Sequence, residues 1–125
     1  MEDGRQDDAR DFTLPNGEQS FNLRGWLLGS ASSRTAGKVR WSEISIYKTV
    51  GGSYVVAGCG RTVAAGEDDR YWAQVCERPQ GVIERLHMFD RDGSRYIPHT
   101  SKIALQQARD ADRDLDQAFL VQTVD

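Results

Sequence analysis

The chain of 125 residues lacks long apolar runs and has only two cysteines. No segment approaches the roughly 18 apolar residues that a membrane-spanning helix needs, so we expect no membrane-crossing segment. The first five residues carry net negative charge, whereas a signal peptide begins with basic residues followed by apolar ones, and this favours a cytoplasmic protein. Cys59 and Cys76 are too few for a disulfide scaffold or for a cysteine-based zinc site.

Motifs for catalysis and for cofactor binding are also missing. His87 and His99 are not spaced as a metal-binding pair. The segment Gly58-Cys59-Gly60 does not continue into a dinucleotide-binding fingerprint, and no glycine-rich loop ends in Gly-Lys-Ser or Gly-Lys-Thr. We therefore predict a protein without catalytic residues, metal or cofactor. An enzyme using Cys59 with one histidine is the alternative, which the strand pattern disfavours because it turns this thiol towards an apolar face.

Charge is distributed unevenly along the chain, which has 16 basic and 19 acidic groups. Residues 1–20 carry six acids and two arginines but only two large apolar side chains, so residues 1–19 are predicted to be a disordered acidic tail. Residues 21–61 carry six basic residues and one acidic residue, a net charge of +5. Residues 20–125 are long enough for a single domain.

Strand signals dominate the first half of this domain. Alternating apolar residues, or clusters of branched and aromatic residues, mark the strands, and small polar residues or glycines separate them. A hairpin turn is expected at Gly51-Gly52, because two consecutive glycines allow the positive φ angles of a two-residue turn. The four predicted strands are residues 21–28, 39–47, 54–59 and 71–76.

A two-residue turn at Gly51-Gly52 also fixes the register of the strands on either side. Ile46 then pairs with Ala57, and Ile44 pairs with Cys59. One predicted face is nearly all apolar and is expected to cover the core; it carries Ile44, Ile46, Val55, Ala57 and Cys59. The other face mixes aromatic and polar side chains; it carries Trp41, Glu43, Ser45, Tyr47, Tyr54, Val56 and Thr62.

The apolar period changes to that of a helix in the second half. It predicts a helix over residues 79–88, in whose first turn Pro79 is well tolerated. A second helix begins at Thr100 or Ser101, either of which can cap it, and residues 114–119 form a further turn or two. The predicted class is therefore α+β, with an antiparallel sheet of about four strands in the first half and two or three helices of the second half packed on one face.

Aromatic and basic side chains gather on the predicted strands and form our candidate binding surface. Tryptophan, tyrosine and arginine dominate the hot spots of protein interfaces, which favours a protein partner. The alternative is single-stranded nucleic acid, whose bases stack on exposed aromatic side chains while cations neutralise its phosphates. A further alternative is that helices cover these aromatic residues as part of the core. The candidate residues are Arg24, Trp26, Arg40, Trp41, Tyr47, Lys48 and Tyr54.

One segment is similar to known proteins. Residues 40–48, Arg-Trp-Ser-Glu-Ile-Ser-Ile-Tyr-Lys, and residues 51–56, Gly-Gly-Ser-Tyr-Val-Val, resemble short uncharacterised proteins of actinobacteria and of their phages or plasmids. Some of these proteins are called EXLDI-type; the Glu-x-Leu-Asp-Ile signature that gives this name is not present in the chain. The resemblance implies no activity, but it favours an accessory protein of a phage or mobile element that binds a host or viral partner.

These patterns together predict a small regulatory protein that acts without catalysis by binding another protein. Single-stranded nucleic-acid binding through a basic, aromatic sheet face is the alternative function. Exposed tryptophan side chains and a free strand edge would also suit a homodimer. In a third hypothesis, the acidic residues of the N-terminal tail mimic nucleic acid.

Overall fold

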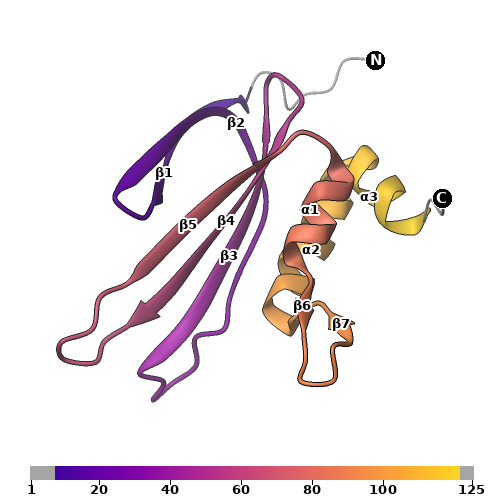
Figure 1. Ribbon diagram of the computed structural model, residues 1–125. Coiled ribbons are helices and arrows are strands. Elements are labelled where there is room, and N and C mark those ends of the chain that lie inside the picture. Colours follow the sequence, from indigo (N-terminus) through magenta and orange to yellow (C-terminus); the bar gives the residue numbers. More distant parts are fainter. Residues whose placement is uncertain (1–7, 122–125) are drawn as a thin grey trace.

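The computed structural model of the protein describes residues 8–121, which form an antiparallel sheet followed by helices (Figure 1). Neighbouring strands are consecutive in sequence throughout the main sheet. The sheet curls so that the turn after its first strand meets its last strand, where the Gly17 N–H donates to the Tyr71 carbonyl at 2.9 Å. The strands are β1 (Arg10–Asn16), β2 (Gln19–Ser32), β3 (Arg40–Thr49), β4 (Tyr54–Thr62) and β5 (Arg70–Cys76).

The second half is mainly helical, and Figure 1 shows its helices on one side of the sheet. This arrangement confirms the predicted α+β class, with five main strands where the sequence predicted about four. No helix in the described part of the chain is long and apolar enough to cross a membrane. The remaining elements are α1 (Pro79–Leu86), β6 (Met88–Phe89), β7 (Arg95–Tyr96), α2 (His99–Ala111) and α3 (Arg113–Leu120).

The main core lies between the sheet and the helices. α2 lies very close to the sheet at Gly29 of β2, where an added Cβ would lie 2.3 Å from the Ala104 carbonyl oxygen. Because backbone atoms occupy that space, only glycine lets the helix dock on the strand here. The buried members of this core are Leu28, Ile46, Tyr54, Val56, Cys76, Val82, Leu86, Ala104, Leu105, Ala108 and Leu115.

A second apolar cluster lies on the opposite face of the sheet, where β1 curls towards β5. Leu14 and Tyr47 are buried in it, and the rings of Phe12 and Tyr47 meet edge to face with centroids 4.9 Å apart. Residues 10–16 are therefore an ordered strand, although the charge pattern placed them in a disordered tail. Phe12 and Leu14 alternate along the strand and therefore face the same apolar cluster. The low apolar content of the whole segment gave no indication of this. Residues 1–7 of the predicted tail lie outside the described residues.

The turn between β3 and β4 differs from the prediction by one residue. The Thr49 N–H donates to the Ser53 carbonyl at 2.8 Å, so the loop has three residues, and Gly52 at its end has a φ of 96°. The extra loop residue shifts every pair, so that Ile46 faces Val56. The predicted faces are therefore wrong. The helix-covered face carries Ile44, Ile46, Lys48, Tyr54 and Val56, and the opposite face carries Trp41, Glu43, Tyr47, Val55, Ala57 and Cys59.

Candidate functional site

Two of the predicted binding residues connect the sheet to the helices. The Tyr54 side chain is only 1% exposed, and its hydroxyl donates to Asp112 at 2.5 Å. The Lys48 ammonium lies 2.8 Å from the same carboxylate and 5.3 Å from the centroid of the Tyr54 ring. Both side chains are therefore engaged inside the protein and leave no aromatic surface for a partner.

Three further predicted residues are also dispersed. Tyr47 is buried on the sheet face opposite to Tyr54, and Trp26 packs against the main core below the helices. Arg24 is exposed on β2 and forms a surface ion pair with Asp11 of β1 at 3.2 Å. The mixed aromatic face predicted from the sequence is divided in the structure, because the one-residue shift of register sends Tyr47 and Tyr54 to opposite sides.

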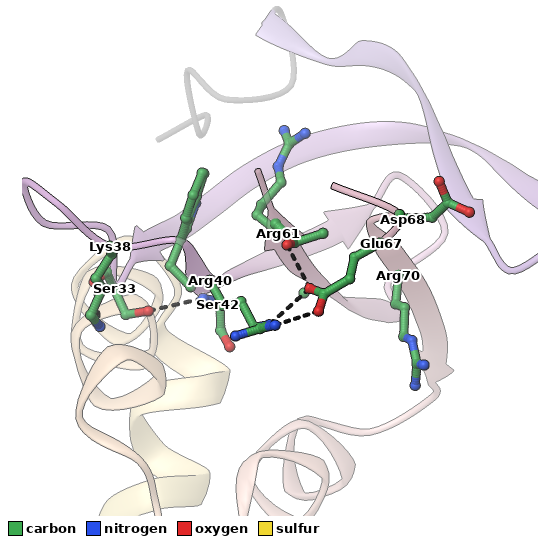
Figure 2. Close-up of a pocket in the computed structure, with 12 residues that line it drawn as sticks. Ser33, Lys38, Arg40, Ser42, Arg61, Glu67, Asp68 and Arg70 are labelled. Carbon is green, nitrogen blue, oxygen red and sulfur yellow. Dashed lines mark hydrogen bonds and ion pairs between the residues drawn. The ribbon is translucent and has the colours of Figure 1, made fainter. Parts of the chain in front are cut away.

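The last two predicted residues, Arg40 and Trp41, line a charged cleft of about 770 Å³ at the end of β3 and β4 (Figure 2). The Arg40 guanidinium donates two hydrogen bonds to the Glu67 carboxylate, and Figure 2 shows these side chains pointing towards one another. The Thr62 hydroxyl donates to the same carboxylate at 2.8 Å. The hydrogen bonds from Arg40, which have the largest effect, and from Thr62 lower the pKa of Glu67 to about 2.

Carboxylates also engage Arg61, a second cation of this charged cleft. Arg61 pairs with Glu43 at 3.0 Å and with Asp69 at 3.1 Å. Trp41 donates its indole N–H to Glu43 at 3.1 Å, and the Arg34 guanidinium stands 4.6 Å from the centroid of its ring. Arg40 and Arg61 are already paired with carboxylates and therefore attract a phosphate weakly, whereas Lys38 and Arg70 line the cleft without an ion pair to a carboxylate among residues 8–121.

A second cleft, of about 550 Å³, opens between the sheet and the helices. We call it the apolar cleft, because most of its surface is contributed by apolar atoms of residues such as Ile44, Trp72, Leu86 and Met88. Its volume lies within the roughly 300–1,000 Å³ of typical ligand-binding pockets. Sequence reasoning missed it, because its walls come from β3, β4, β5, α1, β6 and the start of α2.

The position of Trp72 in the apolar cleft depends on a glycine. Gly58 of β4 pairs with Trp72 of β5, and an added Cβ at Gly58 would lie 2.3 Å from the indole ring. The ring therefore lies flat across the strand. On its other side stands the Arg85 guanidinium of α1, 3.7 Å from the ring centroid. This cation–π pair forms one wall of the cleft.

The β6–β7 hairpin lies beside the apolar cleft and carries exposed apolar side chains. Figure 1 shows this hairpin beyond the ends of α1 and α2. Met88 lines the cleft and pairs with Tyr96, and these side chains are 48% and 45% exposed. The neighbouring Phe89 is 67% exposed. A sequence signal was available, since Met88 and Phe89 precede a turn rich in aspartate and glycine, but Met88 was assigned to the end of the predicted helix.

The structure brings no metal-ligand set together in residues 8–121. Cys59 is buried, and burial is the main cause of a pKa raised above its ordinary value. The thiol therefore lacks the acidity of an activated nucleophile, although it lies on the face of Glu43 and not on the apolar face that the sequence predicted. Comparisons with protein-family models, with curated proteins and with solved structures found no match to this chain.

Proposed function

We propose that this protein acts without catalysis and binds an apolar segment of another protein in the apolar cleft. One observation carries the proposal: Met88 lines the cleft, and Phe89 and Tyr96 of the same β6–β7 hairpin are also exposed. Exposed apolar surface beside a preformed cleft is typical of an interaction site. Aromatic and methionine side chains are also enriched at such interfaces.

A protein segment suits this site better than single-stranded nucleic acid. Nucleic-acid platforms combine exposed aromatic rings with cations that are available to phosphates. In this protein Tyr47 and Tyr54 are buried, and Arg40 and Arg61 already pair with carboxylates. In keeping with the resemblance of residues 40–56, we place this activity in an accessory protein of a phage or mobile element.

The test is an affinity capture from a lysate of an actinobacterial host, with and without nuclease, using the tagged full chain and two variants. Met88→Lys places a charge at the apolar cleft, and Phe89→Ser removes the most exposed ring of the hairpin. Val63→Ser is the matched control, because Val63 is also 67% exposed but lies outside the cleft. We expect a stoichiometric protein that survives nuclease, is captured with the Val63→Ser variant, and is lost with the other two.

Other outcomes of this capture overturn the proposal. The nucleic-acid alternative would be favoured if all variants captured nucleic acid and if nuclease treatment left no captured material. A protein captured equally by Met88→Lys, Phe89→Ser and the control would place the interaction elsewhere on the surface. Far-UV circular dichroism of each variant checks that the fold is retained.

A further inference from the structure

The first turn of α2 forms a polar part of the apolar cleft, whose lining also includes Ser33, Ser42 and Glu43; the Glu43 carboxylate is already paired with Arg61. His99, Thr100 and Ser101 of this turn line the cleft. The residue before the helix is Pro98, and no side chain caps the first turn. The first backbone N–H that donates within the helix is that of Lys102, to the Pro98 carbonyl at 2.9 Å. The preceding N–H groups are therefore available to an acceptor, at the positive end of the helix dipole.

Ser101 provides a second, independent donor on the wall of this cleft. It is only 6% exposed, yet its hydroxyl has no hydrogen-bond partner within residues 8–121. Buried hydroxyl groups are almost always paired, because an unpaired one is destabilising. Ser101 belongs to the lining of the apolar cleft, so an acceptor bound there can supply the absent partner.

Arg85 supplies a positive charge to the same cleft. Its guanidinium lies over Trp72 at 3.7 Å and forms no ion pair with a carboxylate in the described part of the chain. Arg40 and Arg61 of the charged cleft differ in this respect, since both are paired with carboxylates. An unpaired guanidinium, a buried hydroxyl and a helix N-terminus along one cleft form a set of donors suited to an anion.

We infer that the segment bound in the apolar cleft is the C-terminal end of a partner protein, with an apolar last residue and a free carboxylate. The carboxylate accepts hydrogen bonds from the Ser101 hydroxyl and from the N–H groups at the start of α2, and Arg85 balances its charge. The apolar side chain lies against Trp72 and Ile44. A volume of about 550 Å³ holds only a few side chains, which suits a chain end better than a long segment. This inference rests on the proposed function.

N-acetylated tetrapeptides ending in valine, leucine, isoleucine or phenylalanine test it directly. They are titrated into ¹⁵N-labelled full-length protein, once with a free carboxylate and once as the C-terminal amide. We expect the free acids to shift the backbone N–H signals of Thr100 and Ser101 and the indole signal of Trp72. The free acids should bind at least about tenfold more tightly than the amides, since the amides lose the charge-assisted hydrogen bonds.

Two variants and a matched control assign the effect to named groups. Ser101→Ala removes the hydroxyl and keeps a good helix former, and Arg85→Gln removes the charge. Each should weaken free-acid binding by about tenfold and leave amide binding unchanged. Arg113→Gln removes an exposed arginine of α3 that does not line the cleft, and it should change neither.

The remaining outcomes separate this inference from the proposed function. If acids and amides bound equally well in the cleft, recognition of the terminal carboxylate would be excluded, but the proposed function would not be affected. If phenylacetate bound as tightly as the peptides, the ligand would be a small aromatic acid and not the C-terminal end of a protein. Absence of any shift with every probe would also overturn the inference, while the capture experiment with Met88→Lys decides the proposed function separately.

Discussion

The hydroxyl of Tyr54 donates to the carboxylate of Asp112 and so joins β4 to the junction of α2 and α3. Asp112 also accepts from the Lys48 ammonium at 2.8 Å and, as the N-cap of α3, from the Leu115 N–H at 3.1 Å. Burial raises the pKa of this carboxyl, but the hydrogen bonds outweigh burial and hold the pKa below its ordinary value of 3.8. Lys48 and Tyr54, which the sequence analysis predicted to bind a partner, thus connect the sheet to the helices through hydrogen bonds to Asp112.

Asp112→Ala should destabilise the protein strongly. The substitution leaves the Lys48 ammonium and the Tyr54 hydroxyl without this partner and removes the side-chain cap of α3, and the expected loss is about 3 kcal/mol. Urea unfolding followed by circular dichroism measures it. Asp114→Ala is the control, because Asp114 is exposed and lies 3.8 Å from Lys48. A similar loss for both variants would contradict the special role of Asp112.

The Asp112 carboxylate also predicts how stability depends on pH. Because its pKa is lowered in the folded state, its contribution is fully present above the unfolded value of 3.8 and is lost as the pH falls through the folded value. The stability advantage over Asp112→Asn should therefore shrink below about pH 4. Urea unfolding of both proteins between neutral and acidic pH measures the difference. A constant difference across this range would exclude the ionised carboxylate as its source.

Gly29→Ala should destabilise the docking of α2 on β2. The added Cβ would lie 2.3 Å from the Ala104 carbonyl oxygen, and a backbone atom cannot move aside without shifting the helix. We expect a loss of about 1–3 kcal/mol, as in overpacked cores. Gly60→Ala is the matched control in β4, since its added Cβ meets nothing within 4 Å, and it should be neutral. Thermal unfolding compares the two variants; a neutral Gly29→Ala would show that α2 is not held this closely.

Both cysteines should react slowly in the folded protein. Cys59 and Cys76 are buried, and burial is the main cause that raises the pKa of each thiol. A raised pKa leaves little thiolate at neutral pH, so alkylation by iodoacetamide should be slow until urea unfolds the chain. Mass spectrometry after timed quenching counts the modified thiols. Rapid native modification of Cys59 would restore the nucleophile hypothesis.

The sequence predicted much of the fold because its signals were local. Strand patterns over residues 39–47 and 54–59 correspond to β3 and β4, and Pro79 opens α1 as expected. β1 was missed because the composition of a long acidic segment outweighed the alternation of Phe12 and Leu14 within it. The loop at Gly51-Gly52 was placed correctly, but one additional loop residue reversed the faces of β4 relative to β3.

The candidate site was largely inaccessible to sequence reasoning. The apolar cleft joins Ile44, Trp72, Arg85 and Ser101, which come from four separate elements. No spacing along the chain connects such residues. Tyr54 and Lys48 were predicted as binding residues from their residue types alone. These residue types occur in internal hydrogen bonds as well as in binding surfaces, so the sequence could not distinguish the two roles. Asp112, the shared partner of Tyr54 and Lys48, lies 58 and 64 positions away in the sequence.

The sequence by itself determined the α+β class, the order of β2 to β5 and of the helices that follow them, and the lack of recognisable catalytic motifs. These properties follow from local periodicity, turn residues and motif spacing, which act over a few neighbouring residues. The tertiary structure decided which face of each strand the helices cover, which cations carboxylates neutralise, and where a cleft stays open. These depend on strand register and on contacts between distant segments, and a shift of one residue in a single loop is enough to exchange the faces of a strand.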